Sequence, residues 1–101
     1  MSDGATIDEV VARALAAYEA LGTLGEQIED EWTYVTDLVA AWKARLEAVV
    51  VARGTEPAAP AVEAAIDRAI AEIALITDPH RAIDWLSTFP QVVLVALGEG
   101  L

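Results

Sequence analysis

Apolar side chains recur through the middle of the chain at intervals of alternately four and three residues. The series runs from Ile28 to Val49, and Gly54 follows it. A spacing of about 3.5 residues per turn keeps one apolar stripe facing a partner along a helix. With the capping sequence Thr23-Leu24-Gly25-Glu26 before it, this spacing predicts one long helix over residues 23–53. The stripe consists of Ile28, Trp32, Val35, Val39, Trp42, Leu46 and Val49.

The length of this helix favours self-association. At about 1.5 Å per residue, it would extend about 45 Å. A compact chain of this size has a radius of gyration of about 13 Å, so one copy does not cover such a helix comfortably. We therefore expect a second copy to complete the packing of the stripe.

The residues ahead of the long helix carry another amphipathic pattern. Residues 1–5 form a lead without apolar spacing. Thr6 and Glu9 then match the two ends of a capping box, and apolar residues follow at helical intervals. This pattern predicts a helix over 6–21, with Gly22 as its stop.

The residues behind the long helix predict a hairpin. Residues 54–59 are typical of a linker, and Pro60 suits the first position of a helix. Apolar residues in steps of four and three predict that this helix covers 60–77. Because the linker is short, we expect the helices over 23–53 and 60–77 to pack antiparallel.

Two prolines divide the C-terminal part. Asp78 is the expected N-cap and Pro79 the first residue of a short helix over 78–89. Pro90 is expected to end that helix and to begin an apolar tail over 90–101.

The tail contains six consecutive apolar residues, from Val92 to Leu97. Its valines allow a strand, but no other segment offers a partner strand, and Gly98 suits the end of a two-turn helix. Apolar side chains would cover every face of that helix, so we expect it to wedge between its own bundle and a neighbouring subunit. The expected core or interface residues here are Trp85, Phe89, Val92, Val93, Leu94 and Leu97.

These elements predict an all-α chain with a single domain over 1–101. The expected architecture is a helical bundle built on a hairpin of two long antiparallel helices. An N-terminal helix and short C-terminal helices join this hairpin, and oligomerisation completes the bundle.

Composition narrows the classes of partner. The 101 residues include 6 Lys and Arg against 17 Asp and Glu, which gives a formal net charge of −11. The clustered cations that bind nucleic acids or anionic membrane surfaces are missing. The sequence has no cysteine, which excludes disulfides and fits a reducing compartment. With no secretion signal and no apolar run of about 20 residues, we expect a soluble cytoplasmic protein that binds neither nucleic acid nor membrane.

Candidate chemistry centres on His80, the only histidine. One helical turn separates it from Asp84, so the two side chains could share a metal or form a hydrogen-bonded pair. The ligand set is too small for a usual zinc site, so a surface histidine is the preferred interpretation.

Charge is unevenly distributed along the predicted long helix. Its first half carries the densest acidic cluster, which the positive end of the helix dipole favours without any metal. Antiparallel pairing of two copies would place these acids beside the cations of the second half. The acids are Glu26, Glu29, Asp30, Glu31 and Asp37, and the cations are Lys43, Arg45 and Arg53.

The leading functional hypothesis is a non-enzymatic helical module for protein–protein interaction and assembly. It would associate with itself, most simply as a dimer, as a structural or scaffolding part of a larger complex, with no catalytic residue, cofactor or metal. One alternative is a small metal-binding or enzymatic bundle that uses His80 and nearby carboxylates. Another is an acidic, antitoxin-like or decoy protein that covers a basic surface of its partner.

Overall fold

The computed structural model describes residues 5–99 as a compact bundle of four helices. This confirms the predicted all-α class, and no β-strand occurs within residues 5–99 beyond one isolated bridge between Thr6 and Pro57. The predictions for residues 1–4, 100 and 101 concern residues outside this range. The helices are α1 (Ile7–Gly25), α2 (Glu29–Arg53), α3 (Pro60–Ile73) and α4 (Pro79–Ala96).

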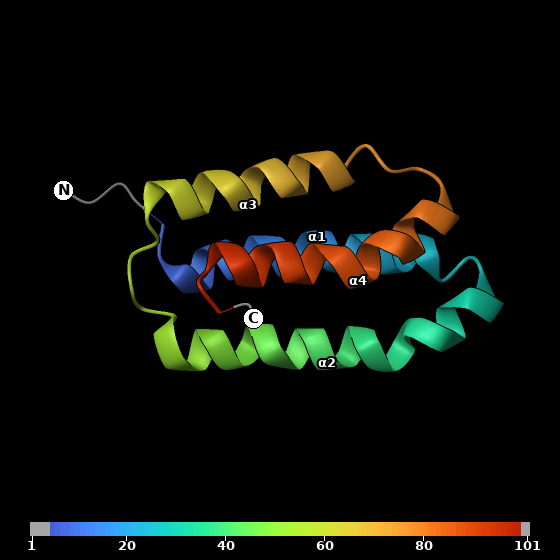
Figure 1. Cartoon of the computed structure of the whole chain (residues 1–101), viewed down its shortest axis with the longest axis horizontal. Coiled ribbons are helices and arrows are strands. Elements are labelled where there is room, and N and C mark those ends of the chain that lie inside the picture. The colour runs from blue at the N-terminus through green and yellow to red at the C-terminus, as the bar shows by residue number, and fades with distance from the viewer. Residues whose placement is uncertain (1–4, 100–101) are drawn as a thin grey trace.

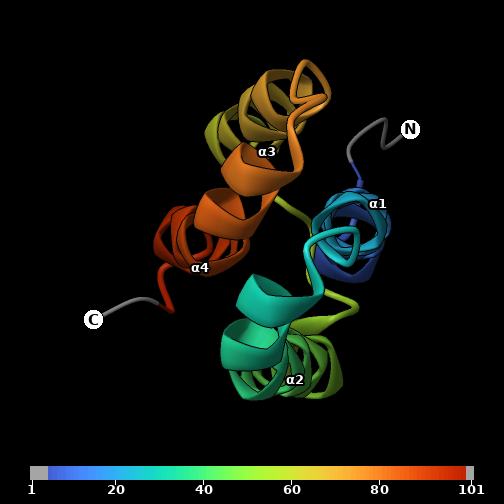
Figure 2. The same cartoon turned by 90° about the vertical axis from the view of Figure 1, so that its right-hand side faces the viewer.

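Helices α1 and α4 form the centre of the bundle. They pack against each other, and α2 and α3 lie on opposite sides of this pair (Figures 1 and 2). The chain direction alternates from each helix to the next along the sequence (Figure 1). Helix α4 contacts all three other helices, so the last helix of the four supplies the middle of the core.

The predicted hairpin of two long helices is wrong as a packing unit. Helices α2 and α3 run antiparallel, but no residues of the two described helices contact each other, because α1 and α4 separate them. The linker between them crosses the start of α1 instead. Its Glu56 carbonyl accepts from the Ile7 N–H at 2.8 Å, and the Ala58 N–H donates to the Ala5 carbonyl at 2.8 Å.

The boundary between the first two helices also differs from the prediction. Helix α1 continues through Gly22 and Thr23 to Gly25, so Gly22 is not a stop and Thr23 is not an N-cap. The Thr23 hydroxyl donates to the Glu19 carbonyl at 3.1 Å, as a threonine inside a helix does. At the other end, the predicted capping box is confirmed, since the Thr6 N–H donates to Glu9 Oε1 at 2.8 Å.

The interior glycines of α1 serve close packing. A Cβ atom added to Gly25 would lie 3.1 Å from Ile83 Cγ1 and 3.2 Å from Leu86 Cδ1. A Cβ on Gly22 would contact the Trp32 ring at 3.5 Å. The absence of a side chain at Gly25 therefore lets α4 approach α1 closely, and this packing offsets the poor helix propensity of glycine.

The dimensions of the bundle remove the reason, based on helix length, to expect a second copy. Helix α2 has 25 residues, which corresponds to about 38 Å. The bundle is elongated, with extents of 48 × 25 × 20 Å and a radius of gyration of 13.6 Å. A single chain is therefore long enough to accompany α2 over its whole length.

The two predicted C-terminal elements form one helix, α4, with Pro90 in its interior. Because proline has no N–H, the carbonyl of Leu86, four residues earlier, loses its helical donor. The hydroxyl of Tyr18 on α1 donates to this carbonyl at 2.8 Å. A neighbouring helix thus supplies the hydrogen bond that the proline removes, and α4 continues past it.

Tyr18 is enclosed by the α1/α4 interface. Only 1% of the residue is exposed, and its ring stacks on Phe89 with the centroids 6.3 Å apart. Burial raises the pKa of its hydroxyl to about 12, because a phenolate would lose its hydration there.

Helix α4 ends at Ala96, and Gly98 closes it two residues later, as the sequence predicted. This residue has a φ of +79°, and its N–H donates to the Val95 carbonyl at 3.0 Å. The Glu99 N–H donates to the Leu94 carbonyl at 2.8 Å, which completes a Schellman motif. The tail is therefore helical, as expected, although Pro90 does not start it.

Two arginines of α2 hold the end of α4. Arg53 Nη1 donates to the Leu97 carbonyl at 2.8 Å and lies 2.7 Å from Glu99 Oε2. Arg45 Nη2 donates to the Glu99 carbonyl at 2.9 Å. Cations at this position stabilise a helix because its carboxyl end carries partial negative charge.

Burial within one chain accounts for most of the apolar tail. Val93, Leu94 and Leu97 are buried, Val92 is half-buried, and Val95 is 61% exposed. The tail needs no neighbouring subunit to cover its faces, so the predicted wedge between two subunits loses its physical reason. Among the described residues, no helix combines the length and apolar character that crossing a membrane requires.

Candidate functional site

The structure places His80 beside a carboxylate that the sequence did not suggest. His80 Nδ1 lies 2.7 Å from Glu31 Oε2, with the two side chains 66% and 44% exposed. This pair joins the first turn of α4 to the first turn of α2. Asp84, the partner proposed from helical spacing, instead accepts hydrogen bonds at its main-chain oxygen from Ser87 and Thr88.

The acidic cluster at the start of α2 does not converge on one point. Glu29 and Asp30 are exposed, and Glu31 turns to His80. Within residues 5–99, no three histidine or carboxylate side chains are grouped closely enough to hold a metal ion.

The three tryptophans occupy different surroundings. Trp32 lies against Gly22 of α1, and Trp85 faces a hollow near the loop between α3 and α4. Trp42 is half-buried, and the Arg45 guanidinium lies 5.7 Å from the centroid of its ring. The buried Trp42 Nε1 has no hydrogen-bond acceptor among the described residues.

The predicted core and interface residues fall into two groups. Leu46, Val49, Phe89, Val93, Leu94 and Leu97 are buried. Ile28, Trp32, Val35, Val39, Trp42, Trp85 and Val92 are half-buried and pack against the edge of the core. The apolar stripe of α2 is therefore covered near its C-terminal end and partly open before Leu46.

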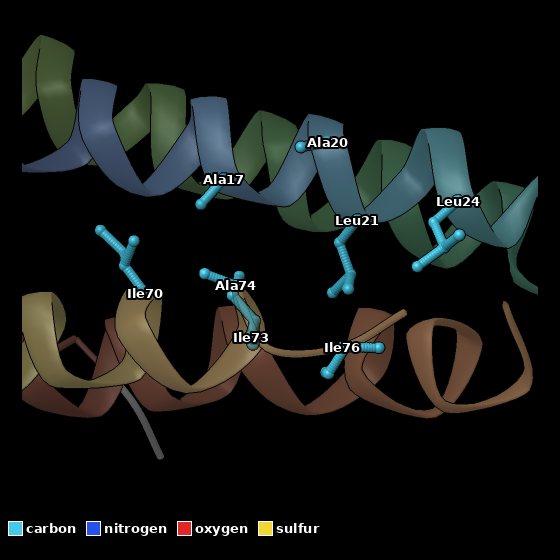
Figure 3. Close-up of a pocket in the computed structure, with 8 residues that line it drawn as sticks. All are labelled: Ala17, Ala20, Leu21, Leu24, Ile70, Ile73, Ala74 and Ile76. Atoms are coloured by element: carbon cyan, nitrogen blue, oxygen red, sulfur yellow. The ribbon is translucent and has the colours of Figure 1, made fainter. Parts of the chain in front are cut away.

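A groove without charged residues lies between α1 and α3. We call it the α1/α3 groove; its volume is about 200 Å³, and Figure 3 shows its side chains. Leu21 and Leu24 of α1 project toward Ile73 and Ile76 of the other wall (Figure 3). Its lining is Ala17, Ala20, Leu21, Leu24, Ile70, Ile73, Ala74 and Ile76. Leu75, between two lining residues, is 82% exposed.

A longer groove follows the contact between α1 and α2. Two hollows, of about 350 Å³ and 250 Å³, lie one after the other along it, and we call them together the α1/α2 groove. The first is lined by Asp8, Val11, Ala12, Leu15, Glu47, Val50 and Val51. The second is lined by Tyr18, Glu19, Gly22, Thr23, Glu26, Trp32, Val39 and Lys43. The ion pair of Lys43 Nζ with Glu19 Oε2, at 3.1 Å, spans this groove.

Sequence reasoning missed the residues of α1 that form these walls. Two exposed alanines of α1 belong to these walls: Ala12 lines the α1/α2 groove, and Ala20 lines the α1/α3 groove. Comparison with protein-family models, with curated proteins and with solved structures finds no match to the chain.

Proposed function

We propose that this chain is a non-enzymatic helical interaction module that associates with itself as a structural or scaffolding part of a larger cytoplasmic complex. The observation that carries the proposal is the α1/α3 groove, whose lining contains no charged residue, beside the exposed Leu75. The absence of cysteine from the sequence supports the cytoplasmic setting.

The lining of the α1/α3 groove suits an aliphatic occupant. Its side chains are aliphatic throughout, so water inside it finds few hydrogen-bond partners. Three of the lining residues are alanines, which allow another backbone to approach closely. Covering such a surface with apolar groups is favourable, at about 25 cal/mol per Å².

A second copy of the chain supplies a fitting occupant. Leu75, which lies between Ala74 and Ile76 of the groove lining in the sequence, is exposed and lines a neighbouring hollow that also contains Ile76. A twofold axis near this point would place the Leu75 side chain of each copy against the groove of the other. The groove carries no charged lining, so two acidic chains meet there without opposing carboxylates in the contact itself.

The cations of α2 are less free to pair with a second α2 in the folded chain than its charge distribution suggests. Lys43 pairs with Glu19, and Arg53 pairs with Glu56 and Glu99. Arg45 donates to a carbonyl of its own chain. These cations are engaged within one copy, so we place the contact between copies at the α1/α3 groove.

Light scattering coupled to size exclusion tests this proposal over a range of protein concentrations. We expect the wild-type chain to show the mass of a dimer. Ala20→Glu places a charge at the groove and Leu75→Asp replaces the projecting side chain, so both variants should shift toward the monomer. Ala41→Glu, on the exposed side of α2, is the matched control and should keep the wild-type mass.

Circular dichroism checks that each variant keeps its helix content. A wild-type chain with a monomer mass at every concentration would overturn self-association. A dimer that persists in both Ala20→Glu and Leu75→Asp would overturn the assignment to the α1/α3 groove.

A further inference from the structure

The α1/α2 groove differs from the α1/α3 groove in its charge. Its floor is apolar, with Val11, Leu15, Val39 and Trp32 among the lining residues. Its edges carry carboxylates along the whole length. These are Asp8, Glu19, Glu26 and Glu47, against the one cation Lys43, which already pairs with Glu19.

The second hollow of the groove lies where the first part of α2 packs loosely. Among the described residues of α2, none is buried before Leu46, although Trp32, Val35, Val39 and Trp42 face the bundle. Side chains of this size normally bury most of their surface in a core of their own chain. Their partial exposure leaves apolar area for another molecule to cover.

We propose that the α1/α2 groove binds a basic amphipathic helix of another protein. The apolar face of that helix would lie on the floor of the groove, in the way that amphipathic helices occupy grooves in other complexes. Its Lys and Arg side chains would flank the apolar face and reach the carboxylates at the edges. The lining residues of the groove run along α1 from Asp8 to Thr23. The 19 residues of α1 correspond to about 28 Å, which is the length of a helix of about 18 residues.

The charge of the chain argues against a second copy in this groove. Four of its six Lys and Arg residues, at positions 13, 43, 45 and 53, already contact acidic side chains or carbonyls of their own chain. The remaining two, Arg68 and Arg81, lie on different helices. No described helix therefore combines an apolar face with free cations at both flanks, and a second acidic chain would oppose the carboxylates of the groove.

Self-association through the α1/α3 groove is a separate property. This inference adds a partner to the proposed interaction module and uses a different surface. The two are distinguished by measuring partner binding in Ala20→Glu as well as in the wild-type chain, since that substitution lies in the α1/α3 groove. If the Ala20→Glu variant is a monomer and still binds the partner, self-association and partner binding use different surfaces.

Fluorescence anisotropy with a labelled synthetic peptide tests the inference on the full chain. The probe is an amphipathic helix of about 18 residues built from Leu and Lys. One comparison peptide replaces every Lys with Glu, and another keeps the Lys residues but distributes the Leu residues around all faces. We expect the first peptide to bind, the acidic peptide not to bind, and the scrambled peptide to bind at least about tenfold more weakly.

Variants of the chain locate the binding. Ala12→Lys places a cation in the groove, whereas Ala41→Lys places the same cation on the exposed side of α2. The double variant Glu26→Gln with Glu47→Gln removes two edge carboxylates, and Glu72→Gln with Asp84→Asn removes two carboxylates that do not line this groove. We expect the groove variants to lose at least about tenfold in affinity and the controls to stay within about twofold.

Circular dichroism and thermal melting confirm that all four variants remain folded. If the groove variants and their controls lose equal affinity for the peptide, the peptide is attracted to the acidic surface as a whole. That result would overturn the inference. Equal binding of the amphipathic and scrambled peptides would overturn it as well, because the apolar floor would then play no part.

Discussion

Helix α1 meets its neighbours α4 and α2 in opposite ways. Toward α4, its side chains are enclosed. The Tyr18 ring stacks on Phe89, and the Tyr18 hydroxyl donates a hydrogen bond to the Leu86 carbonyl. Toward α2, the contact opens into a groove with acidic edges, and Leu15 remains half-buried. The central contact thus holds the bundle together, and the lateral contact leaves apolar surface for another molecule.

The largest expected effect comes from a matched pair of leucines on the two sides. Leu86→Ala removes a fully buried side chain from the central contact and should lower the free energy of unfolding by about 3–5 kcal/mol. Leu15→Ala makes the same change in the groove, where water already reaches the side chain, and should cost about 1 kcal/mol. Urea denaturation measures both. Similar losses in the two variants would mean that the lateral contact is as important for stability as the central one.

A smaller effect is expected when the Tyr18 hydroxyl is removed. Tyr18→Phe leaves the Leu86 carbonyl without its donor and should cost about 1–2 kcal/mol. In a Pro90→Ala background, the new N–H at position 90 can serve that carbonyl, so the same substitution should cost less there. A double-mutant cycle by urea denaturation measures this coupling. An unchanged cost in the Pro90→Ala background would contradict the assigned role.

Tyr18 also gives the central contact a pH signature. The unfolded chain releases the phenolic proton near pH 10, whereas the folded chain holds it to a pKa of about 12. Between these values the unfolded state binds fewer protons, so the contribution of Tyr18 to stability is complete below pH 10 and falls as the pH rises toward 12. Tyr18→Phe should reduce this fall, and Tyr34→Phe, at an 88% exposed position, should not. Thermal melting across this pH range provides the comparison.

The smallest effect is expected from the ion pair across the lateral groove. Both partners are solvent-accessible, with side-chain exposures of 37% for Lys43 and 63% for Glu19. Lys43→Ala should therefore change stability by less than about 1 kcal/mol, and the loss should shrink further in salt. A cycle with Glu19→Ala isolates the pair by thermal denaturation. A loss comparable to that of Leu86→Ala would show that this ion pair, rather than the central core, holds α2 in place.

The sequence predicted the helical class and several helix ends for local reasons. The capping box at Thr6, the first helical position of Pro60 and the stop at Gly98 each depend on a few neighbouring residues. Predictions from such residues agree with the folded structure because these residues act on the backbone groups of the helix end at which they lie.

The helix boundaries predicted from the sequence are wrong where contacts with distant residues override a local signal. Gly22 looked like a stop, but it lies inside α1, beside the Trp32 ring of α2. Pro90 looked like a boundary, but a tyrosine more than 60 residues earlier supplies the missing donor. The spacing of apolar residues near Gly22 or Pro90 indicates neither of these contacts. The grooves beside α1 were missed for the same reason, since their walls come from different helices.

The central position of α4 has a consequence for how the chain folds. Synthesis delivers α1, α2 and α3 first, yet α2 and α3 do not contact each other and meet only through α1 and α4. Until α4 arrives, the side chains that will cover Tyr18 and fill the middle of the core are absent. We therefore expect the first three helices to form no stable intermediate of their own. Folding should wait for α4 and then proceed as one cooperative step.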